Sequence, residues 1–139
     1  MKLVAWQSVL TCGLAVVLAW AGGSLAAERV TIGQLHQYHK SYNMRAGTVV
    51  GKVAEMQAFP PMPVAIGRCR TLYGKAQFVL VDDTGSLSVE SVGSCFEAAM
   101  HLPHDGDLIQ LTTEILVYIR EGQTTEVMKA LTREIVILK

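Results

Sequence analysis

Hydrophobic and polar residues alternate over much of the chain after residue 46, a pattern typical of β-strands with one buried face. The clearest case is 86–92, where Leu87 and Val89 are predicted to point inward and the polar residues between them outward. The pattern predicts five strands, at residues 47–56, 76–81, 86–92, 108–120 and 127–138.

In the last predicted strand, four apolar residues are expected to share one face: Val127, Leu131, Ile135 and Ile137. In the first strand, Gly51 predicts a bulge or a sharp bend.

Helical spacing and turn residues predict the segments between the strands. Apolar residues from Ile32 onward recur at helical spacing and predict a short helix from Thr31 to Lys40, with Thr31 as its N-cap. A second short helix is expected over 94–102, ended by Pro103. Three prolines in 59–63 open a predicted loop of about fifteen residues, and loops this long are usually functional.

This order of elements favours an all-β fold. The predicted order has a helix before the first strand and a short helix between the third and fourth strands. The five-stranded Greek-key barrel called the OB-fold has this order. The alternative is an immunoglobulin-type sandwich. That fold needs about seven strands and a core tryptophan, whereas both tryptophans here, Trp6 and Trp20, precede residue 27.

Three segments carry a family resemblance that covers about residues 45–138: Thr48-Val-Val-Gly-Lys-Val, Phe78-Val-Leu-Val-Asp-Asp-Thr-Gly-Ser-Leu-Ser-Val and Asp105-Gly-Asp-Leu-Ile-Gln-Leu. With the apolar strand that follows, they resemble OB domains of the anticodon-binding and single-strand-binding type. The resemblance implies ligand binding on the face of the second and third strands. Members that bind nucleic acid carry aromatic and basic residues there. Here the residues predicted to face outward are polar, with Phe78 as the only aromatic: Gln77, Ser86, Ser88 and Glu90.

The first 26 residues differ in composition from the rest of the 139-residue chain. Lys2 is their only charged residue, an apolar run follows it, and small residues lead up to Ala26. The pattern predicts a signal peptide (1–26) cleaved after Ala26, leaving one domain over 27–139 in the periplasm or secreted. An uncleaved membrane anchor is the alternative, but the interrupted run is shorter than a spanning helix. The chain resembles small periplasmic OB-fold proteins of bacteria in its size and in its predicted export signal.

Charge gives no indication of a polyanionic partner. The whole chain has twelve basic and twelve acidic residues, and loss of Lys2 leaves eleven against twelve, a net charge of −1. A nucleic-acid partner is therefore disfavoured, as it is by export.

Cleavage after Ala26 would leave two of the three cysteines, Cys69 and Cys95. In an oxidising compartment such a pair predicts a disulfide, worth roughly 3–4 kcal/mol in the loop-entropy model. Two thiolate ligands or a redox pair are the alternative, although the sequence has no C-x-x-C motif.

The four histidines form two H-x-x-H pairs: His36 with His39, and His101 with His104. Neutral imidazoles bind zinc or copper, so a metal- or haem-handling protein is one hypothesis. The alternative is two solvated pairs at the ends of secondary structure elements.

A basic cluster with one aromatic residue lies in and after the predicted long loop: Arg68, Arg70, Tyr73 and Lys75. OB barrels hold ligands beside this loop, so these residues, with Lys52 and Phe78, are the predicted ligand-binding residues. The alternative is a solvated loop held by Cys69.

The Asp83-Thr84-Gly85-Ser86 segment resembles the signature of aspartic proteases, but Asp82 precedes it where that family has an apolar residue. A hairpin turn explains it better, and no other catalytic motif is present. The sequence thus predicts an exported, non-enzymatic binding module for an anionic or polar ligand or an envelope protein partner, with no cofactor. The alternatives are metal or haem handling and single-stranded nucleic-acid binding.

Overall fold

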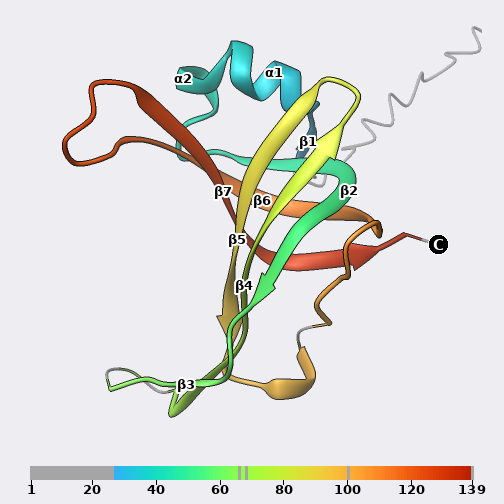
Figure 1. Cartoon of the computed structure of the whole chain (residues 1–139), viewed down its shortest axis with the longest axis vertical. Helices are drawn as coiled ribbons and strands as arrows, with labels where there is room; N and C mark the ends of the chain where they lie inside the picture. Colours follow the sequence, from blue (N-terminus) through green and yellow to red (C-terminus); the bar gives the residue numbers. More distant parts are fainter. Residues whose placement is uncertain (1–26, 66, 68, 100, 139) are drawn as a thin grey trace, which may run out of the picture.

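The computed structural model describes residues 27–65, 67, 69–99 and 101–138. The predicted signal peptide and Arg68 lie outside the described residues. The fold is an all-β OB-fold barrel, as predicted (Figure 1). Its five long strands match the five predicted ones: β2 (Ala46–Ala58), β4 (Thr71–Asp82), β5 (Gly85–Ser94), β6 (Leu108–Ile119) and β7 (Glu126–Ile137).

The barrel closes because β2 is shared by two partners. Its first half pairs with β6 and its second half with β4, and Lys52 pairs with a residue of each. On the other side β5 runs parallel to β7, which pairs with β6. Gly51 stands at the change of partner, where an added Cβ would lie 2.7 Å from the Val81 carbonyl oxygen. The predicted bulge falls later in β2, between Ala54 and Gln57.

Two short strands extend this sheet. β1 (Glu28–Arg29) runs parallel to β2, and β3 (Met62–Pro63) pairs with the start of β4. The prediction of a fifteen-residue loop was therefore wrong. Met62 and Pro63, near its start, form an edge strand, where a proline needs no backbone partner, and β4 already begins at Thr71.

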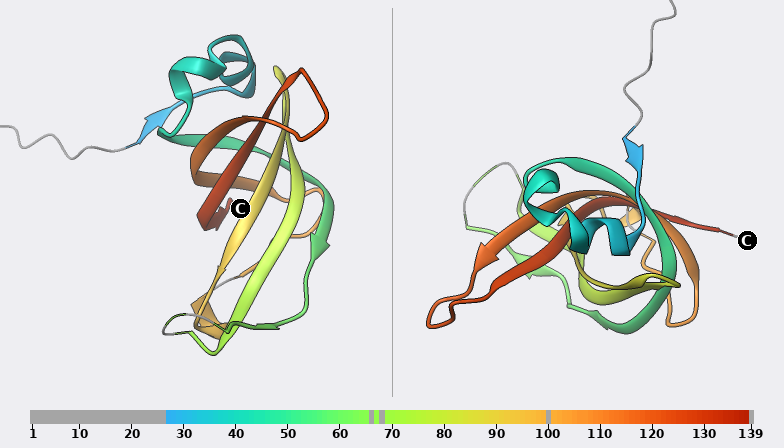
Figure 2. Two further views of the ribbon diagram at one scale, coloured as in Figure 1. Left: turned by 90° about the vertical axis from the view of Figure 1, so that its left-hand side faces the viewer. Right: turned by 90° about the horizontal axis from the view of Figure 1, so that it is seen from above.

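The predicted helix over 31–40 is two short helices, α1 (Ile32–Gln37) and α2 (His39–Tyr42), which lie at one end of the barrel (Figure 2). Thr31 is the N-cap of α1, as expected, and forms a capping box with Gln34. The predicted helix over 94–102 was largely wrong. Its first residue still belongs to β5, and among the residues of this segment that the structure describes only the 3₁₀ turn η1 (Glu97–Ala99) is helical.

The β4–β5 turn holds α1 against the barrel. The Asp82 carboxylate accepts hydrogen bonds from the backbone N–H of Ile32 (3.0 Å), Thr84 (2.7 Å) and Gly85 (3.0 Å), and from the Thr84 hydroxyl (2.5 Å). The Thr84 hydroxyl in turn accepts from Gly33 N–H at 2.7 Å. The segment that resembles a protease signature is therefore a hairpin turn that binds the first turn of a helix.

The core fills the barrel between the inward faces of the strands and α1. Its largest fully buried apolar side chains are Ile32, Leu35, Leu80, Leu87, Ile109, Leu111, Ile115 and Val49.

A bulge in β7 changes which alternate residues of the strand point into the barrel. Thr113 pairs with Thr132 and Thr112 with Glu134, so Arg133 is an extra residue. Thr132 is buried before the bulge, and Ile135 packs against the core after it. An extra residue reverses which side chains face inward. The prediction that Val127 and Leu131 share a face with Ile135 was therefore wrong.

A polar groove on the outer face of the barrel

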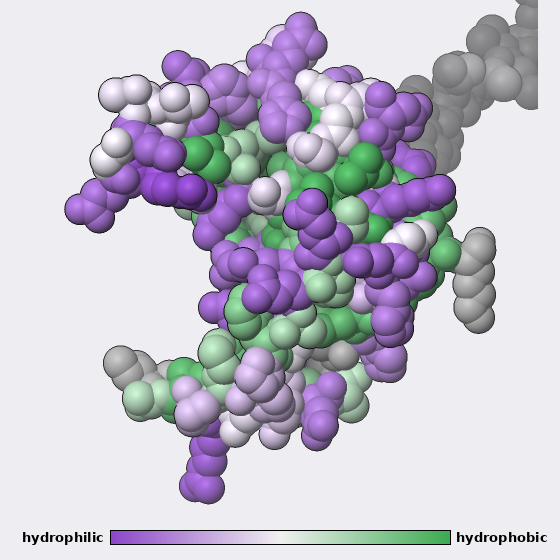
Figure 3. All heavy atoms as spheres, in the orientation of Figure 1, coloured by the Kyte–Doolittle hydropathy of each residue, from purple (hydrophilic) through white to green (hydrophobic). Residues whose placement is uncertain are grey.

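A groove of about 330 Å³ lies on the outer face of β4 and β5. Figure 3 shows the hollow, with the β6–β7 hairpin projecting on one side and the β3 end of the barrel on the other. Its lining comes from the second half of β2, from β4 and β5, and from the hairpin: Glu55, Gln57, Gln77, Phe78, Val79, Ser88, Val89, Glu90, Tyr118, Arg120, Val127, Met128 and Lys129.

Strand register places polar side chains in cross-strand rows on the floor of the groove. Ser88 pairs with Val79 on one side and Lys129 on the other, and Gln77 pairs with both Gln57 and Glu90. Successive side chains alternate between faces, so the polar residues of β4 and β5 point outward while their neighbours fill the core. The floor consequently offers hydrogen-bond donors and acceptors.

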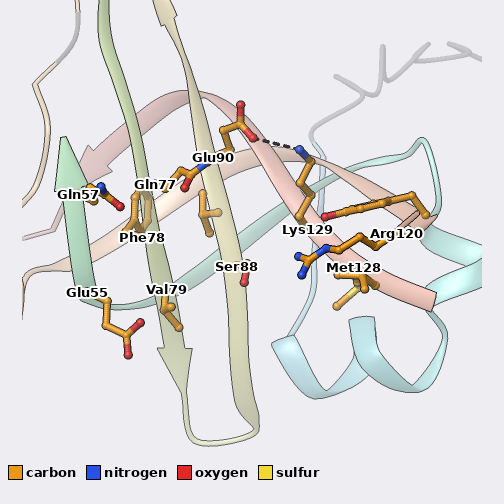
Figure 4. Close-up of a pocket in the computed structure, with 13 residues that line it drawn as sticks. Glu55, Gln57, Gln77, Phe78, Val79, Ser88, Glu90, Arg120, Met128 and Lys129 are labelled. Atoms are coloured by element: carbon orange, nitrogen blue, oxygen red, sulfur yellow. Dashed lines mark hydrogen bonds and ion pairs between the residues drawn. The ribbon is translucent and has the colours of Figure 1, made fainter. Parts of the chain in front are cut away.

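Glu90 lies between two lysines. Its carboxylate is 3.0 Å from the Lys129 ammonium (Figure 4). It also lies 3.8 Å from the Lys75 ammonium, and its side chain is 21% exposed. The Lys129 ammonium also lies 5.6 Å from the ring centroid of Tyr118, within the range of a cation–π contact. The two lysines, the carboxylate and the aromatic ring therefore form one connected cluster, the Glu90 cluster.

Two further charges line the groove beyond this cluster. Arg120 follows β6 on the hairpin, and Glu55 projects from β2 on the opposite side (Figure 4). Neither forms an ion pair with another residue in the part of the chain that the structure describes. The lining thus carries two cations, Arg120 and Lys129, and two carboxylates, Glu55 and Glu90. It is polar without an excess of either charge.

The predicted ligand-binding residues lie in several places. Lys75 reaches the groove through Glu90. Phe78 borders the groove, but its side chain is 3% exposed and belongs to the core, so its prediction as an outward aromatic was wrong. Arg70, Tyr73 and Lys52 are absent from the lining. Tyr73 and Lys75 lie in strand β4 rather than in the predicted loop.

Sequence reasoning missed Tyr118, Arg120 and Lys129, which the hairpin contributes. The available signal was the position of Lys129, two residues from both Val127 and Leu131. Alternate residues of a strand share one face, so Lys129 lies on the same face as Val127 and Leu131. The charge of Lys129 indicates that this face of β7 points outward.

The histidine pairs lie on different elements. His39 contacts Glu126 at 2.7 Å, and the ring of His36 donates to the Ser86 carbonyl oxygen at 2.7 Å. His101 and His104 follow η1. Among the described residues, no group of three or more His, Cys, Asp or Glu side chains is arranged to hold a metal ion. Metal or haem binding stays a prediction.

The hydrogen bond from His39 lowers the pKa of the Glu126 carboxyl below its ordinary value of 4.5. Partial desolvation opposes this shift, and the charge of Lys40 adds to it. The contact connects α2 to the first residue of β7, which pairs with Ile119 at the turn end of the hairpin.

Cys69 and Cys95 form a disulfide, as predicted, with their Cα atoms 5.3 Å apart. It joins the segment between β3 and β4 to the residue after β5. A disulfide is typical of proteins in an oxidising compartment. Among the described residues, no helix has the length and apolar character needed to cross a membrane.

Solved structures support the fold. The chain is similar to the second OB-fold domain of replication protein A from Methanococcus maripaludis, with a TM-score of 0.53 and 16% identity over 80% of this chain and 95% of that one. It is also similar to a protein described as an aspartyl-tRNA synthetase from Leishmania major, with a TM-score of 0.56 and 8% identity over 86% of this chain. This chain spans 22% of that synthetase. No family model and no curated protein sequence matches the chain. At these identities the likeness shows the OB-fold alone.

Proposed function

We propose that this chain is an exported, non-enzymatic binding module that holds a polar ligand, or a polar segment of a protein partner, in the groove over β4 and β5. The observation that carries the proposal is the groove itself: a hollow of about 330 Å³ lined by side chains that donate and accept hydrogen bonds. Ligand sites are concave and contain a few well-placed polar groups.

The arrangement of the lining supports binding of an extended ligand. Gln57 and Gln77 lie beside each other on adjacent strands, and Ser88 lies one strand further along the floor. Each amide provides both a donor and an acceptor. A ligand crossing the strands would meet these groups in succession, with the hairpin residues Arg120 and Lys129 along one side.

The experiment fills the groove and compares binding. Ser88→Trp places an indole on the groove floor, whereas Ser86→Trp places one on the same strand and outward face but outside the lining. The probe is a pool of short peptides containing both lysine and glutamate, titrated into ¹⁵N-labelled protein.

We expect the peptide pool to shift the backbone amide resonances of Gln77, Ser88 and Lys129, and Ser88→Trp to abolish the shifts while Ser86→Trp preserves them. Shifts confined to another face of the barrel, or equal binding by the two variants, would contradict the proposal.

A second candidate function is binding of single-stranded nucleic acid. Two observations favour it. A similar structure is an OB-fold domain of replication protein A, and the groove lining contains the Tyr118 ring together with two cations. The same titration with an oligothymidylate tests it. Nucleic-acid binding predicts shifts at Tyr118 and Arg120 that weaken steeply with added salt.

Export rests on the predicted signal peptide and on the Cys69–Cys95 disulfide. The disulfide favours an oxidising compartment such as the periplasm or the extracellular space. Mass spectrometry of the protein recovered from that compartment tests both features. We expect a mass that begins at Ala27 and is about two daltons below that of the reduced chain, because a disulfide removes two hydrogens.

A further inference from the structure

This inference rests on the proposed function. We infer that Glu90 determines the ligand class of the groove: it pairs with Lys129 and Lys75, and it selects for neutral or mixed-charge polar ligands and against polyanions such as single-stranded nucleic acid. The inference starts from the position of this carboxylate. It lies 3.0 Å from the Lys129 ammonium and 3.8 Å from the Lys75 ammonium, on the outer face where a ligand would lie.

The groups that a nucleic-acid strand would use are therefore already bound to one another. Lys129 contacts both the Glu90 carboxylate and one face of the Tyr118 ring. A base stacking on that face would have to displace the ammonium, and a phosphate approaching the ammonium would meet the carboxylate. Glu90 thus acts on two kinds of contact at once, through the same lysine.

Partial burial strengthens the repulsion between the Glu90 carboxylate and an incoming phosphate. The side chain of Glu90 is 21% exposed and those of Lys75 and Lys129 are each 32% exposed. Charges in partly buried positions are less screened by salt than charges in open solvent. The carboxylate therefore opposes an incoming phosphate more strongly than an exposed surface carboxylate would.

A neutral or mixed-charge ligand meets no such barrier. The amides of Gln57 and Gln77 and the hydroxyl of Ser88 lie on the same floor. They bind a peptide backbone or a polar side chain without disrupting the Glu90 cluster.

The experiment removes the charge of Glu90 and keeps its shape. Glu90→Gln is compared with Glu55→Gln, which removes an equal charge from the same groove at a residue that forms no ion pair among the described residues. The probe is a fluorescent oligothymidylate of about twelve nucleotides, which matches the site size of OB domains, followed by anisotropy in rising salt.

We expect Glu90→Gln to bind the oligonucleotide more tightly than both the unaltered protein and Glu55→Gln. Loss of the carboxylate raises the net charge of the Glu90 cluster from +1 to +2. One added positive charge would increase the slope of log affinity against log salt by about 0.7, so the affinity of Glu90→Gln falls about 2.6-fold more than that of the unaltered protein between about 50 and 200 mM salt. Adding Lys129→Gln to Glu90→Gln should reverse most of the gain. Glu90→Ser, which continues the serine pattern of residues 86 and 88, serves if the glutamine variant does not fold.

Equal oligonucleotide binding by Glu90→Gln and Glu55→Gln would overturn the inference, and so would tight, salt-sensitive binding by the unaltered protein. These outcomes differ from a failure of the proposed function. That failure appears in the peptide titration of the Trp variants, whereas the Glu90 comparison depends on the oligonucleotide alone.

Discussion

Replacing Asp82 with alanine tests whether the β4–β5 turn holds the barrel and α1 together. The Asp82 carboxylate accepts four hydrogen bonds, of which one comes from the Ile32 N–H at the start of α1. Ile32 is fully buried in the core, so loosening the first turn of the helix also disturbs core packing. The two turn N–H groups can be solvated after the substitution, which limits the loss.

Hydrogen bonds to a charged group contribute about 1.5–3 kcal/mol, and the Thr31 cap of α1 stays in place in this variant. We therefore expect Asp82→Ala to lower the free energy of unfolding by about 2–3 kcal/mol, as measured by urea denaturation. The matched control is Asp83→Ala. Asp83 is exposed and forms no hydrogen bond through its side chain among the described residues, so its removal should change stability by less than about 0.5 kcal/mol.

The pH dependence gives an independent readout. Desolvation raises the pKa of Asp82, but the hydrogen bonds from Thr84, Ile32 and Gly85 outweigh it and lower the pKa below the ordinary value of 3.8. A carboxyl with a lowered pKa stabilises the fold above its unfolded pKa, and this contribution is lost as the pH falls through the folded pKa. The stability difference between the unaltered protein and Asp82→Ala should therefore shrink in acid. Equal stability of Asp82→Ala and Asp83→Ala, or a difference that grows in acid, would refute this reasoning.

Three further predictions follow from individual contacts. His39→Ala should raise the pKa of Glu126 toward its ordinary value, since the hydrogen bond from His39 is the largest cause of its lowered pKa, and NMR titration of the carboxyl measures the change. A carboxyl resonance that titrates identically in both proteins would contradict it. Replacing both Cys69 and Cys95 with alanine should lower the free energy of unfolding by roughly 3–4 kcal/mol in urea, because the unfolded chain loses its cross-link. Gly51→Ala should destabilise the barrel by about 1–3 kcal/mol in the same assay, because the added Cβ would lie 2.7 Å from a carbonyl oxygen of β4. Gly122→Ala is its comparison, since nothing lies within 4 Å of an added Cβ there and only its backbone conformation is unfavourable.

The fold could be predicted from sequence because the barrel is built from local patterns. Alternation within 86–92 identified β5, and the Asp82–Gly85 turn marked the hairpin before it. Helical spacing and the Thr31 cap identified the N-terminal helices. These signals act over a few residues. The order of the predicted strands and helices along the chain then indicated the barrel topology.

Departures from prediction arose where distant residues decide the local structure. Pairing with the start of β4 makes a short strand of Met62–Pro63, although its prolines alone indicate a loop. The bulge at Arg133 reverses the faces of β7, and a single extra residue leaves the hydrophobic pattern on either side intact. Neither effect can be read from a window of neighbouring residues.

The candidate site depends even more strongly on distant contacts. Glu90 and Lys129 are separated by 39 positions in the chain, and only the parallel pairing of β5 with β7 brings them together. Sequence composition indicates that the charges balance, but not that carboxylate and ammonium meet inside the groove. The distinction matters because dispersed charges would leave each lysine able to bind a phosphate, whereas an internal pair does not. If the inference about Glu90 holds, a chain can keep the OB-fold of its structural neighbours while a single carboxylate changes which ligands its own groove accepts.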